Sequence, residues 1–263
     1  MMRDSTTEGI ALIGFGSSRP YNKEAMMYCI DILKKEGVKN TYYSFIGRES
    51  PTVPEMLKKA FDDGIEKLTV IPFLMATGEM SIKYIPEKLG INGCYGEQVI
   101  ESPRKMIINY VRPIGESPRV ADMFDDMIKN SPAGKGKKGV MLITHGSKKG
   151  YRSDLAKLNL ERMKKLGYKD VYSASVEFEE PSIEDCALKM VQDGVRHIIA
   201  VPMLIASGIH LKEDIPVALG LKENMTKGTA RIWDRDIRID ITKPIGKHPL
   251  MKDVLIDIME KIE

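Results

Sequence analysis

The chain contains the same segment twice. A shift of 130 residues aligns its halves without a gap for about eighty residues, so that SPTVPEMLKKAFDDGIEKLTVIPFLMATG (50–78) lies over EPSIEDCALKMVQDGVRHIIAVPMLIASG (180–208). Self-similarity of this length indicates a duplicated structural unit. We therefore predict two domains, residues 1–130 and 139–263, joined by the Pro-, Gly- and Lys-rich linker 131–138. Each domain is long enough to bury its own core.

Each half alternates short apolar strands with amphipathic helices, a pattern typical of βαβ units and a parallel sheet. Strands are predicted at residues 9–14, 41–46, 66–73 and 107–112, and again at 139–144, 171–176, 196–203 and 237–242. Helices are predicted at residues 21–36, 51–64 and 118–130, and again at 151–166, 181–194 and 249–262. The expected fold is α/β, with two tandem flavodoxin-like domains. Each is a four-stranded parallel sheet flanked by helices, and a cleft is expected between the two domains.

The composition limits which binding partners and which cellular compartment are expected. The net charge of +3 argues against nucleic acid as a partner, because nucleic-acid binders usually carry a strongly basic surface. The opening segment lacks signal-peptide architecture, and no apolar stretch approaches the roughly 20 residues that a membrane span needs. Three widely spaced cysteines, Cys29, Cys94 and Cys186, fit reduced thiols in the cytoplasm. The sequence also has neither a dinucleotide-binding glycine motif nor a P-loop, so no organic cofactor is expected.

Polar side chains follow three predicted strands of the second half. His145 follows the first strand, Glu177 the second, and His210 lies in the loop after the third. Ligands of open parallel sheets bind beyond the carboxyl ends of the strands, so these side chains are expected to converge. Two imidazoles and one carboxylate suit a divalent metal such as Co²⁺, Ni²⁺ or Fe²⁺. Three protein ligands leave coordination positions open, as a reactive metal site requires.

The first half has lost all three of these residues. Phe15, Gly47 and Met80 occupy the positions of His145, Glu177 and His210, whereas the framework glycines and prolines recur. The fold itself therefore does not need the polar side chains. We predict that only the second half carries the metal. The first half would supply a second wall of the ligand site, where phenylalanine and methionine suit a flat apolar ligand.

The His-Gly-Ser turn offers backbone N–H groups and a hydroxyl at a helix start, an arrangement that binds anions. We expect the surrounding side chains to receive carboxylates of a ligand: Ser147, Lys148 and Lys149, with Ser17, Ser18 and Arg19 from the first half.

Other candidates are assigned lesser roles. Glu179 and Glu180 flank Glu177, and either is an alternative for the working carboxylate, although Glu180 also suits a helix cap. His197 begins a strand at the opposite end of the sheet and is expected to be structural. His248 precedes a proline at a helix start, where capping explains it.

Three segments together resemble a known family. LITHGSKKGYRSDL (142–155), ASVEFEEPSIEDCALKMVQDGVRHIIAVPMLIASGIHLKEDIP (174–216) and KPIGKHP (243–249) are similar to class II tetrapyrrole chelatases of the CbiX branch, the sirohydrochlorin cobaltochelatases. The resemblance is strong over residues 139–250, and residues 9–118 form a degenerate second copy.

This resemblance implies a bilobal fold and an enzyme that inserts a divalent metal, Co²⁺, into sirohydrochlorin in cobalamin biosynthesis and releases two protons. It implies that His145 and His210 bind the metal and that Glu177 is the acidic residue. Ser207 and Gly208, just before His210, are expected to contact the substrate. Short members of the family pair two identical subunits, so the first half here would replace the partner. We accordingly expect a monomer or weak dimer.

Three alternatives stay open at this stage. Ni²⁺ or Fe²⁺ insertion into the same tetrapyrrole would use the same residue types, because affinity alone does not select the metal. A non-catalytic carrier of tetrapyrrole or metal would bind without metallating. A phosphoryl-transfer enzyme with His145 as nucleophile would want converging arginines, and only Arg152 and lysines lie near it in sequence.

Overall fold

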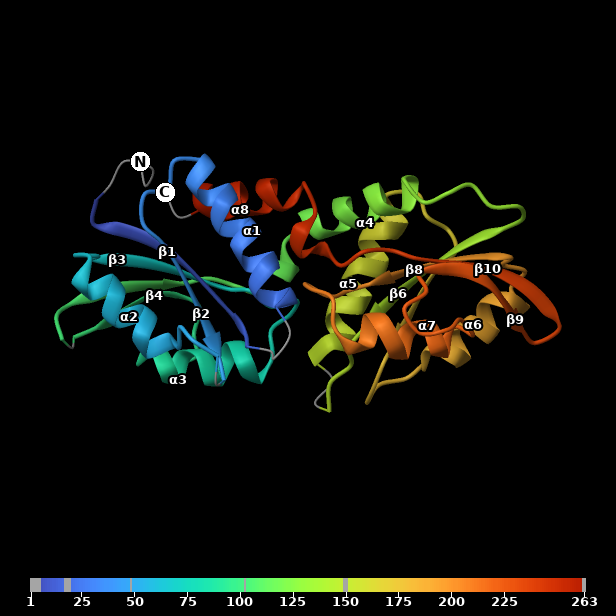
Figure 1. The fold of residues 1–263 in the computed structure, drawn as a ribbon, viewed down its shortest axis with the longest axis horizontal. Coiled ribbons are helices and arrows are strands. Elements are labelled where there is room, and N and C mark those ends of the chain that lie inside the picture. Colours follow the sequence, from blue (N-terminus) through green and yellow to red (C-terminus); the bar gives the residue numbers. More distant parts are fainter. Residues whose placement is uncertain (1–5, 17–19, 48, 102, 149–150, 262–263) are drawn as a thin grey trace. The chain divides into compact units, whose positions relative to one another are not determined.

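The computed structural model describes residues 6–16, 20–47, 49–101, 103–148 and 151–261. It contains two five-stranded sheets with equivalent strand orders, β2-β1-β3-β5-β4 and β7-β6-β8-β10-β9 (Figure 1). The duplication seen in the sequence is therefore a duplication of the sheet and of the order in which its strands are used.

Most elements lie within a few residues of their predicted positions. The first sheet consists of β1 (Glu8–Phe15), β2 (Thr41–Ile46), β3 (Lys67–Pro72), β4 (Gly96–Ile100) and β5 (Met106–Tyr110). The second sheet consists of β6 (Lys138–Thr144), β7 (Val171–Ser175), β8 (His197–Pro202), β9 (Lys227–Ile232) and β10 (Arg235–Ile241). The helices are α1 (Tyr21–Lys35), α2 (Val53–Asp62), α3 (Ile85–Leu89), α4 (Arg119–Lys129), α5 (Tyr151–Lys165), α6 (Ile183–Gln192), α7 (Ile215–Ala218) and α8 (Met251–Glu260). Short 3₁₀ turns lie at Ile114–Glu116 and Ile245–Lys247.

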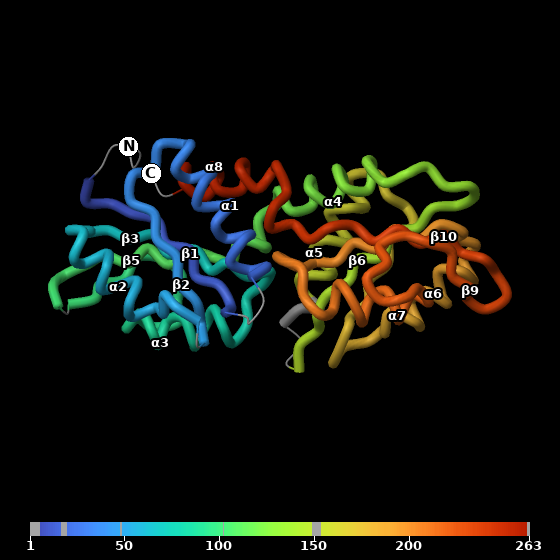
Figure 2. The backbone as a smooth tube through the Cα atoms, in the orientation of Figure 1, coloured from blue at the N-terminus to red at the C-terminus, as the bar shows by residue number. Residues whose placement is uncertain are grey.

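The predicted parallel arrangement is confirmed for the four strands foreseen in each repeat. The expectation of four strands is corrected to five, because β4 and β9 add an antiparallel edge strand to each sheet. Figure 2 shows β9 and β10 running side by side as a hairpin. Both edge strands are largely exposed and begin with or contain glycine, so neither produces the buried apolar run on which the strand prediction depended.

The chain divides into two compact units, and this division does not follow the repeat boundary. Unit 1 comprises Met1–Ser117 with Gly246–Glu263, and unit 2 comprises Pro118–Ile245. In unit 1, α8 from the second repeat packs against α1. In unit 2, α4 from the first repeat packs against α5. The predicted boundaries therefore describe the sequence repeats, whereas the compact units exchange their last helices.

Helices cover both faces of each sheet. In unit 1, α1 and α8 lie on one face, and α2 and α3 lie on the other (Figure 1). Unit 2 has the same layers, with α4 and α5 on one face and α6 and α7 on the other. Buried aliphatic side chains of the strands form the core of each layer, as parallel sheets covered on both faces require.

Among the described residues, no helix combines the length and the apolar character that crossing a membrane would demand.

Candidate metal centre

The candidate site lies at the carboxyl edge of the unit 2 sheet. Strand β6 lies between β7 and β8, so the ends of these three strands are neighbours. Thr144 ends β6 directly before His145, and Ser175 ends β7 two residues before Glu177. After β8, a loop leads to His210, the first residue of a π-helical turn. The sheet order therefore brings the three predicted segments to one edge.

The two predicted histidines face each other. Nε2 of His145 and Nε2 of His210 lie 2.9 Å apart, and their rings are perpendicular, with centroids 4.5 Å apart. Both imidazoles are half-buried, so each remains accessible to a ligand from solvent. The residues stand 65 positions apart in the chain, so only the fold brings these two nitrogens together.

Asp214 orients one of these rings and was missed as a site residue. Its Oδ2 lies 2.6 Å from Nδ1 of His210, four residues earlier on the same turn. A carboxylate at this distance favours a proton on Nδ1, which leaves the Nε2 lone pair directed at His145. The sequence feature that indicates this contact is the spacing of four residues between His210 and Asp214, which places them on the same side of a helical turn. The first repeat has Tyr84 at the matching position.

Glu177 is held at the same edge by its backbone. Its N–H donates to the carbonyl oxygen of His145 over 3.1 Å. A Cβ on Gly146 would lie 1.6 Å from the carbonyl oxygen of Glu177, so only glycine permits this approach. The Glu177 side chain is exposed. In the described part of the chain, no three His, Cys, Asp or Glu side chains form a metal-binding group. The histidines converge, whereas the predicted set of three ligands is not assembled.

A buried hydroxyl pair lies directly behind the histidine edge. Oγ1 of Thr144 and Oγ of Ser175 share a hydrogen bond of 2.9 Å between two strand ends. Both residues are buried, at 2% and 7% exposure. Gly14 and Phe45 occupy the matching positions of the first repeat. The two repeats therefore differ not only in the exposed site residues but also in the buried residues behind them.

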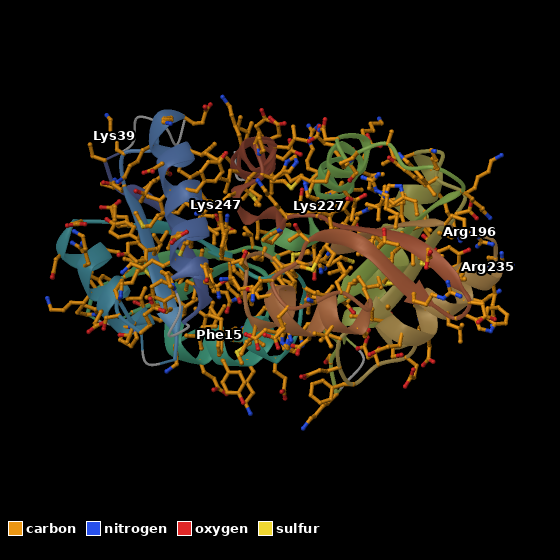
Figure 3. All side chains as sticks on the ribbon, turned by 45° about the vertical axis from the view of Figure 1, so that its right-hand side comes forward. Phe15, Lys39, Arg196, Lys227, Arg235 and Lys247 are labelled. Atoms are coloured by element: carbon orange, nitrogen blue, oxygen red, sulfur yellow. The ribbon has the colours of Figure 1, made fainter. Side chains whose placement is uncertain are left out.

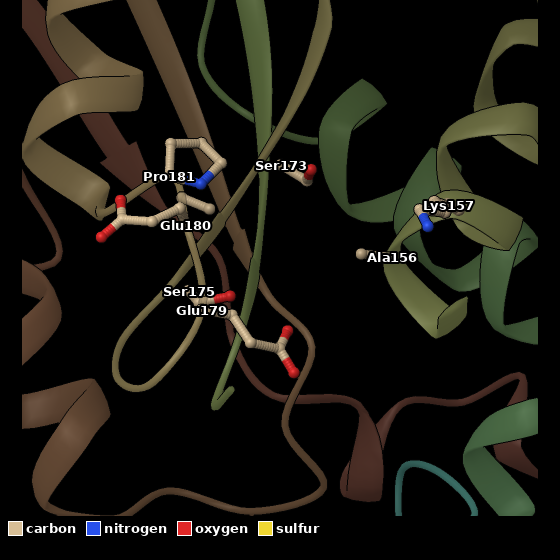
Figure 4. Close-up of a pocket in the computed structure, with 8 residues that line it drawn as sticks. Ala156, Lys157, Ser173, Ser175, Glu179, Glu180 and Pro181 are labelled. Carbon is tan, nitrogen blue, oxygen red and sulfur yellow. The ribbon is translucent and has the colours of Figure 1, made fainter. Parts of the chain in front are cut away.

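The two neighbouring glutamates line a pocket that includes neither histidine. Glu179 lines a pocket between α5 and β7, and Figure 4 shows its carboxylate and the Ser175 hydroxyl on the side that faces Lys157. Glu180 also lines this pocket, and its Oε2 accepts a hydrogen bond from the N–H of Ser182, the residue that caps α6. Neither histidine lines the pocket. The residue that caps α6 is therefore Ser182, and Glu180 bonds to the backbone of that cap.

Two of the expected anion-binding residues belong to the described part of the His-Gly-Ser turn. Ser147 is half-buried and Lys148 is exposed. The Lys148 ammonium lies 5.2 Å from the ring centre of Phe178, a cation–π contact. Ser207 and Gly208 are half-buried in the loop before His210, and a Cβ on Gly208 would meet open space. The remaining residues expected to bind anions lie outside the described residues: Ser17, Ser18, Arg19 and Lys149.

Unit 1 presents different side chains at the matching edge. Phe15, labelled in Figure 3, ends β1 and is 49% exposed. Gly47 is exposed and has a φ of 113°, in the region that favours glycine. Met80 begins a π-helical turn like His210, but it packs partly buried against the core of unit 1. Of the two expected apolar contacts, Phe15 is thus the more accessible.

The other two histidines have structural positions. His197 is fully buried, and its Nε2 lies 2.5 Å from Oδ2 of Asp240. Burial lowers the pKa of His197, and this effect outweighs the opposing influence of the Asp240 carboxylate. Nδ1 of His248 accepts a hydrogen bond from the N–H of Leu250, the N-cap residue of α8, so His248 bonds to the segment just before the helix rather than capping the helix itself.

Comparisons with known proteins identify the family and the fold. The family model described as CbiX matches residues 9–131 and again residues 139–262. A sirohydrochlorin cobaltochelatase of Methanothermobacter thermautotrophicus is 30% identical over 131 residues, which cover 47% of this chain and 92% of that protein. A sirohydrochlorin cobaltochelatase of Methanocaldococcus jannaschii is 35% identical over 135 residues, covering 45% and 94%. Among solved structures, SirB from Bacillus subtilis with Fe³⁺ superposes with a TM-score of 0.73 at 17% identity, covering 97% of this chain and 95% of that one.

Proposed function

The chain belongs to the CbiX family, and from this premise we propose that it inserts a divalent metal ion, Co²⁺, into sirohydrochlorin for cobalamin biosynthesis. The relatives that match about half of this chain are named sirohydrochlorin cobaltochelatases. The net reaction exchanges two pyrrole protons for one divalent metal ion. The metal is a substrate here, and no organic cofactor takes part.

The observation that carries this proposal is the histidine pair. Two imidazole nitrogens on adjacent corners of an octahedral metal, each about 2.1 Å from it, would lie about 3 Å apart. The 2.9 Å between Nε2 of His145 and Nε2 of His210 fits that spacing. The carboxylate of Asp214 on the other nitrogen of His210 is the partner that metal-binding histidines usually have. A second histidine facing His145 also favours metal binding over phosphoryl transfer.

The remaining site residues are proposed to accept the two protons that the macrocycle releases. As the metal passes from the imidazoles to the macrocycle, two pyrrole N–H bonds must break and two protons must be accepted. Imidazole nitrogens released by the metal are suitable acceptors near neutral pH. Glu177 takes the second proton, because its backbone is bonded to His145 and its side chain is exposed at this edge, whereas the Glu180 carboxylate accepts a hydrogen bond from the N–H of Ser182.

Substrate contacts follow from the same edge. Ser147 and Lys148 receive peripheral carboxylates of the macrocycle beside the start of α5, and Ser207 and Gly208 contact it next to His210. We also propose Phe15 and Met80 as apolar substrate-binding residues and Ser17 as a polar one. We place the reaction in the cytoplasm, with the enzyme as a monomer or weak dimer; the free thiols of Cys29, Cys94 and Cys186 support this compartment.

An absorbance assay tests the proposal. Purified protein is mixed with sirohydrochlorin and Co²⁺, Ni²⁺ or Fe²⁺, and metallation is followed by the change in the macrocycle spectrum. We expect Co²⁺ insertion well above the rate without protein. A faster reaction with Ni²⁺ or Fe²⁺ would reassign the metal. Binding without acceleration for every metal would identify a carrier and overturn the chelatase assignment.

A further inference from the structure

Phe178 is an unfavourable residue for its position in the fold. It follows Glu177 directly, has a φ of 64°, and is 57% exposed. A bulky side chain at a left-handed φ is disfavoured by contacts of its Cβ, and an exposed aromatic ring gains nothing from burial. Such strain persists where the surrounding structure enforces it, and it concentrates at functional sites.

The loop that carries Phe178 is fixed to the histidine turn. The N–H of Glu177 bonds to the carbonyl of His145, and the N–H of Glu179 closes a tight turn onto the carbonyl of Glu177 over 2.8 Å. The close approach of the Glu177 carbonyl oxygen to Gly146 also restricts this segment. Phe178 is therefore held at the edge where the two imidazoles lie.

Two further exposed side chains belong to this edge. The Lys148 ammonium lies 5.2 Å from the ring centre of Phe178, so a cation and an aromatic face adjoin. Ile209, directly before His210, is 48% exposed. Phe178 is thus next in sequence to Glu177, the proposed proton acceptor, and Ile209 is next to His210, a proposed metal ligand. The combination of flat apolar surface and positive charge matches a flat macrocycle with carboxylates at its periphery.

We propose that Phe178 is a substrate-binding residue whose ring packs on the face of the tetrapyrrole, while Lys148 beside it receives a peripheral carboxylate. The left-handed backbone turns the ring away from the core and toward the ligand, at a cost to the stability of the fold. This inference rests on the proposed function, because it assigns the residue that orients the macrocycle over the histidine pair.

The variant Phe178→Gly separates binding from folding. Glycine adopts a positive φ without strain, so we expect its urea midpoint to equal or exceed that of the wild type. We expect KM for sirohydrochlorin to rise about tenfold or more, the figure that loss of one good aromatic contact gives. The affinity for Co²⁺ alone should stay unchanged. Phe178→Tyr, which keeps the aromatic face, should restore KM to within about twofold of the wild type.

Trp233 offers a matched control. It has a φ of 54°, is 62% exposed, and lies between β9 and β10 at the end of the sheet where His197 begins β8. Trp233→Gly should relieve the same kind of strain and leave KM unchanged. If Phe178→Gly leaves KM within about twofold of the wild type while the wild type metallates sirohydrochlorin, the inference is wrong and the proposed function stands. If the wild type does not accelerate metallation, the proposed function fails instead, and sirohydrochlorin binding by Phe178→Gly, followed by macrocycle fluorescence, still decides the inference.

Discussion

Thr144 and Ser175 share a buried hydrogen bond of 2.9 Å between the last residues of two neighbouring strands. The bond ties together the strands that end beside His145 and Glu177. Phe45 and Gly14 at the matching positions make no side-chain hydrogen bond of this kind, because neither has a polar side chain. The pair therefore belongs to the half of the chain that carries the site.

Thr144→Val should lower the free energy of unfolding by about 1–3 kcal/mol, because it leaves the Ser175 hydroxyl buried without its partner. Thr69→Val is a matched control. Thr69 is also fully buried, but within the described residues its Oγ1 has no hydrogen-bond partner. That substitution should be neutral or stabilising. Urea unfolding of both variants measures the difference, and equal losses would show that the hydroxyl pair contributes nothing specific.

His145→Ala and His210→Ala should each abolish acceleration of metallation and weaken Co²⁺ binding, because one imidazole alone no longer offers two adjacent ligands. Titration with Co²⁺, followed by its visible absorption bands, measures binding independently of turnover. Phe15→His should add neither binding nor activity, since Gly47 and Met80 still occupy the other two matching positions. Near-wild-type rates in either alanine variant would place the metal elsewhere.

Asp214→Asn should weaken Co²⁺ affinity by about 10- to 100-fold, the usual effect of losing a carboxylate behind a metal-binding imidazole. KM for sirohydrochlorin should change little, because Asp214 acts through His210 rather than on the macrocycle. Glu213→Gln, one residue earlier on the same turn, is the control for loss of a negative charge. Equal weakening by both variants would mean that overall charge, not the hydrogen bond to His210, sets the affinity.

The sequence pattern was sufficient to predict the parallel strands and the meeting of His145 with His210. Both follow from the alternation of strands and helices, which indicates a parallel sheet with its strand ends at one edge. Two residues that follow neighbouring strands could therefore be assigned to the same edge although they are 65 positions apart in the chain. The helix exchange was not predictable in this way. Because α4 and α8 occupy equivalent places in the two repeats, their sequences do not specify which unit they join. Phe178 escaped notice because its strain lies in a backbone angle, which residue type does not reveal.

Stability should also depend on pH through His197. Burial lowers its pKa in the folded protein below the ordinary value of 6.5, and the positive charges of Arg238 and Lys138 act in the same direction against Asp240. Protonation of His197 would place a second N–H on Nδ1, and this nitrogen has no hydrogen-bond partner among the described residues. Gly134 packs closely against it, because a Cβ on Gly134 would lie only 2.4 Å from Nδ1.

The unfolded chain therefore binds a proton more readily than the folded one below pH 6.5. The stabilising contribution of neutral His197 is fully present above that pH and declines as the pH falls through the lowered pKa of the folded state. His197→Gln, whose Nε2 can still donate to Asp240, should lack this decline. Urea unfolding of both proteins between about pH 5 and pH 8 measures it, and the two free-energy curves should converge toward acid pH. Parallel curves would show that His197 does not titrate differently in the folded and unfolded states.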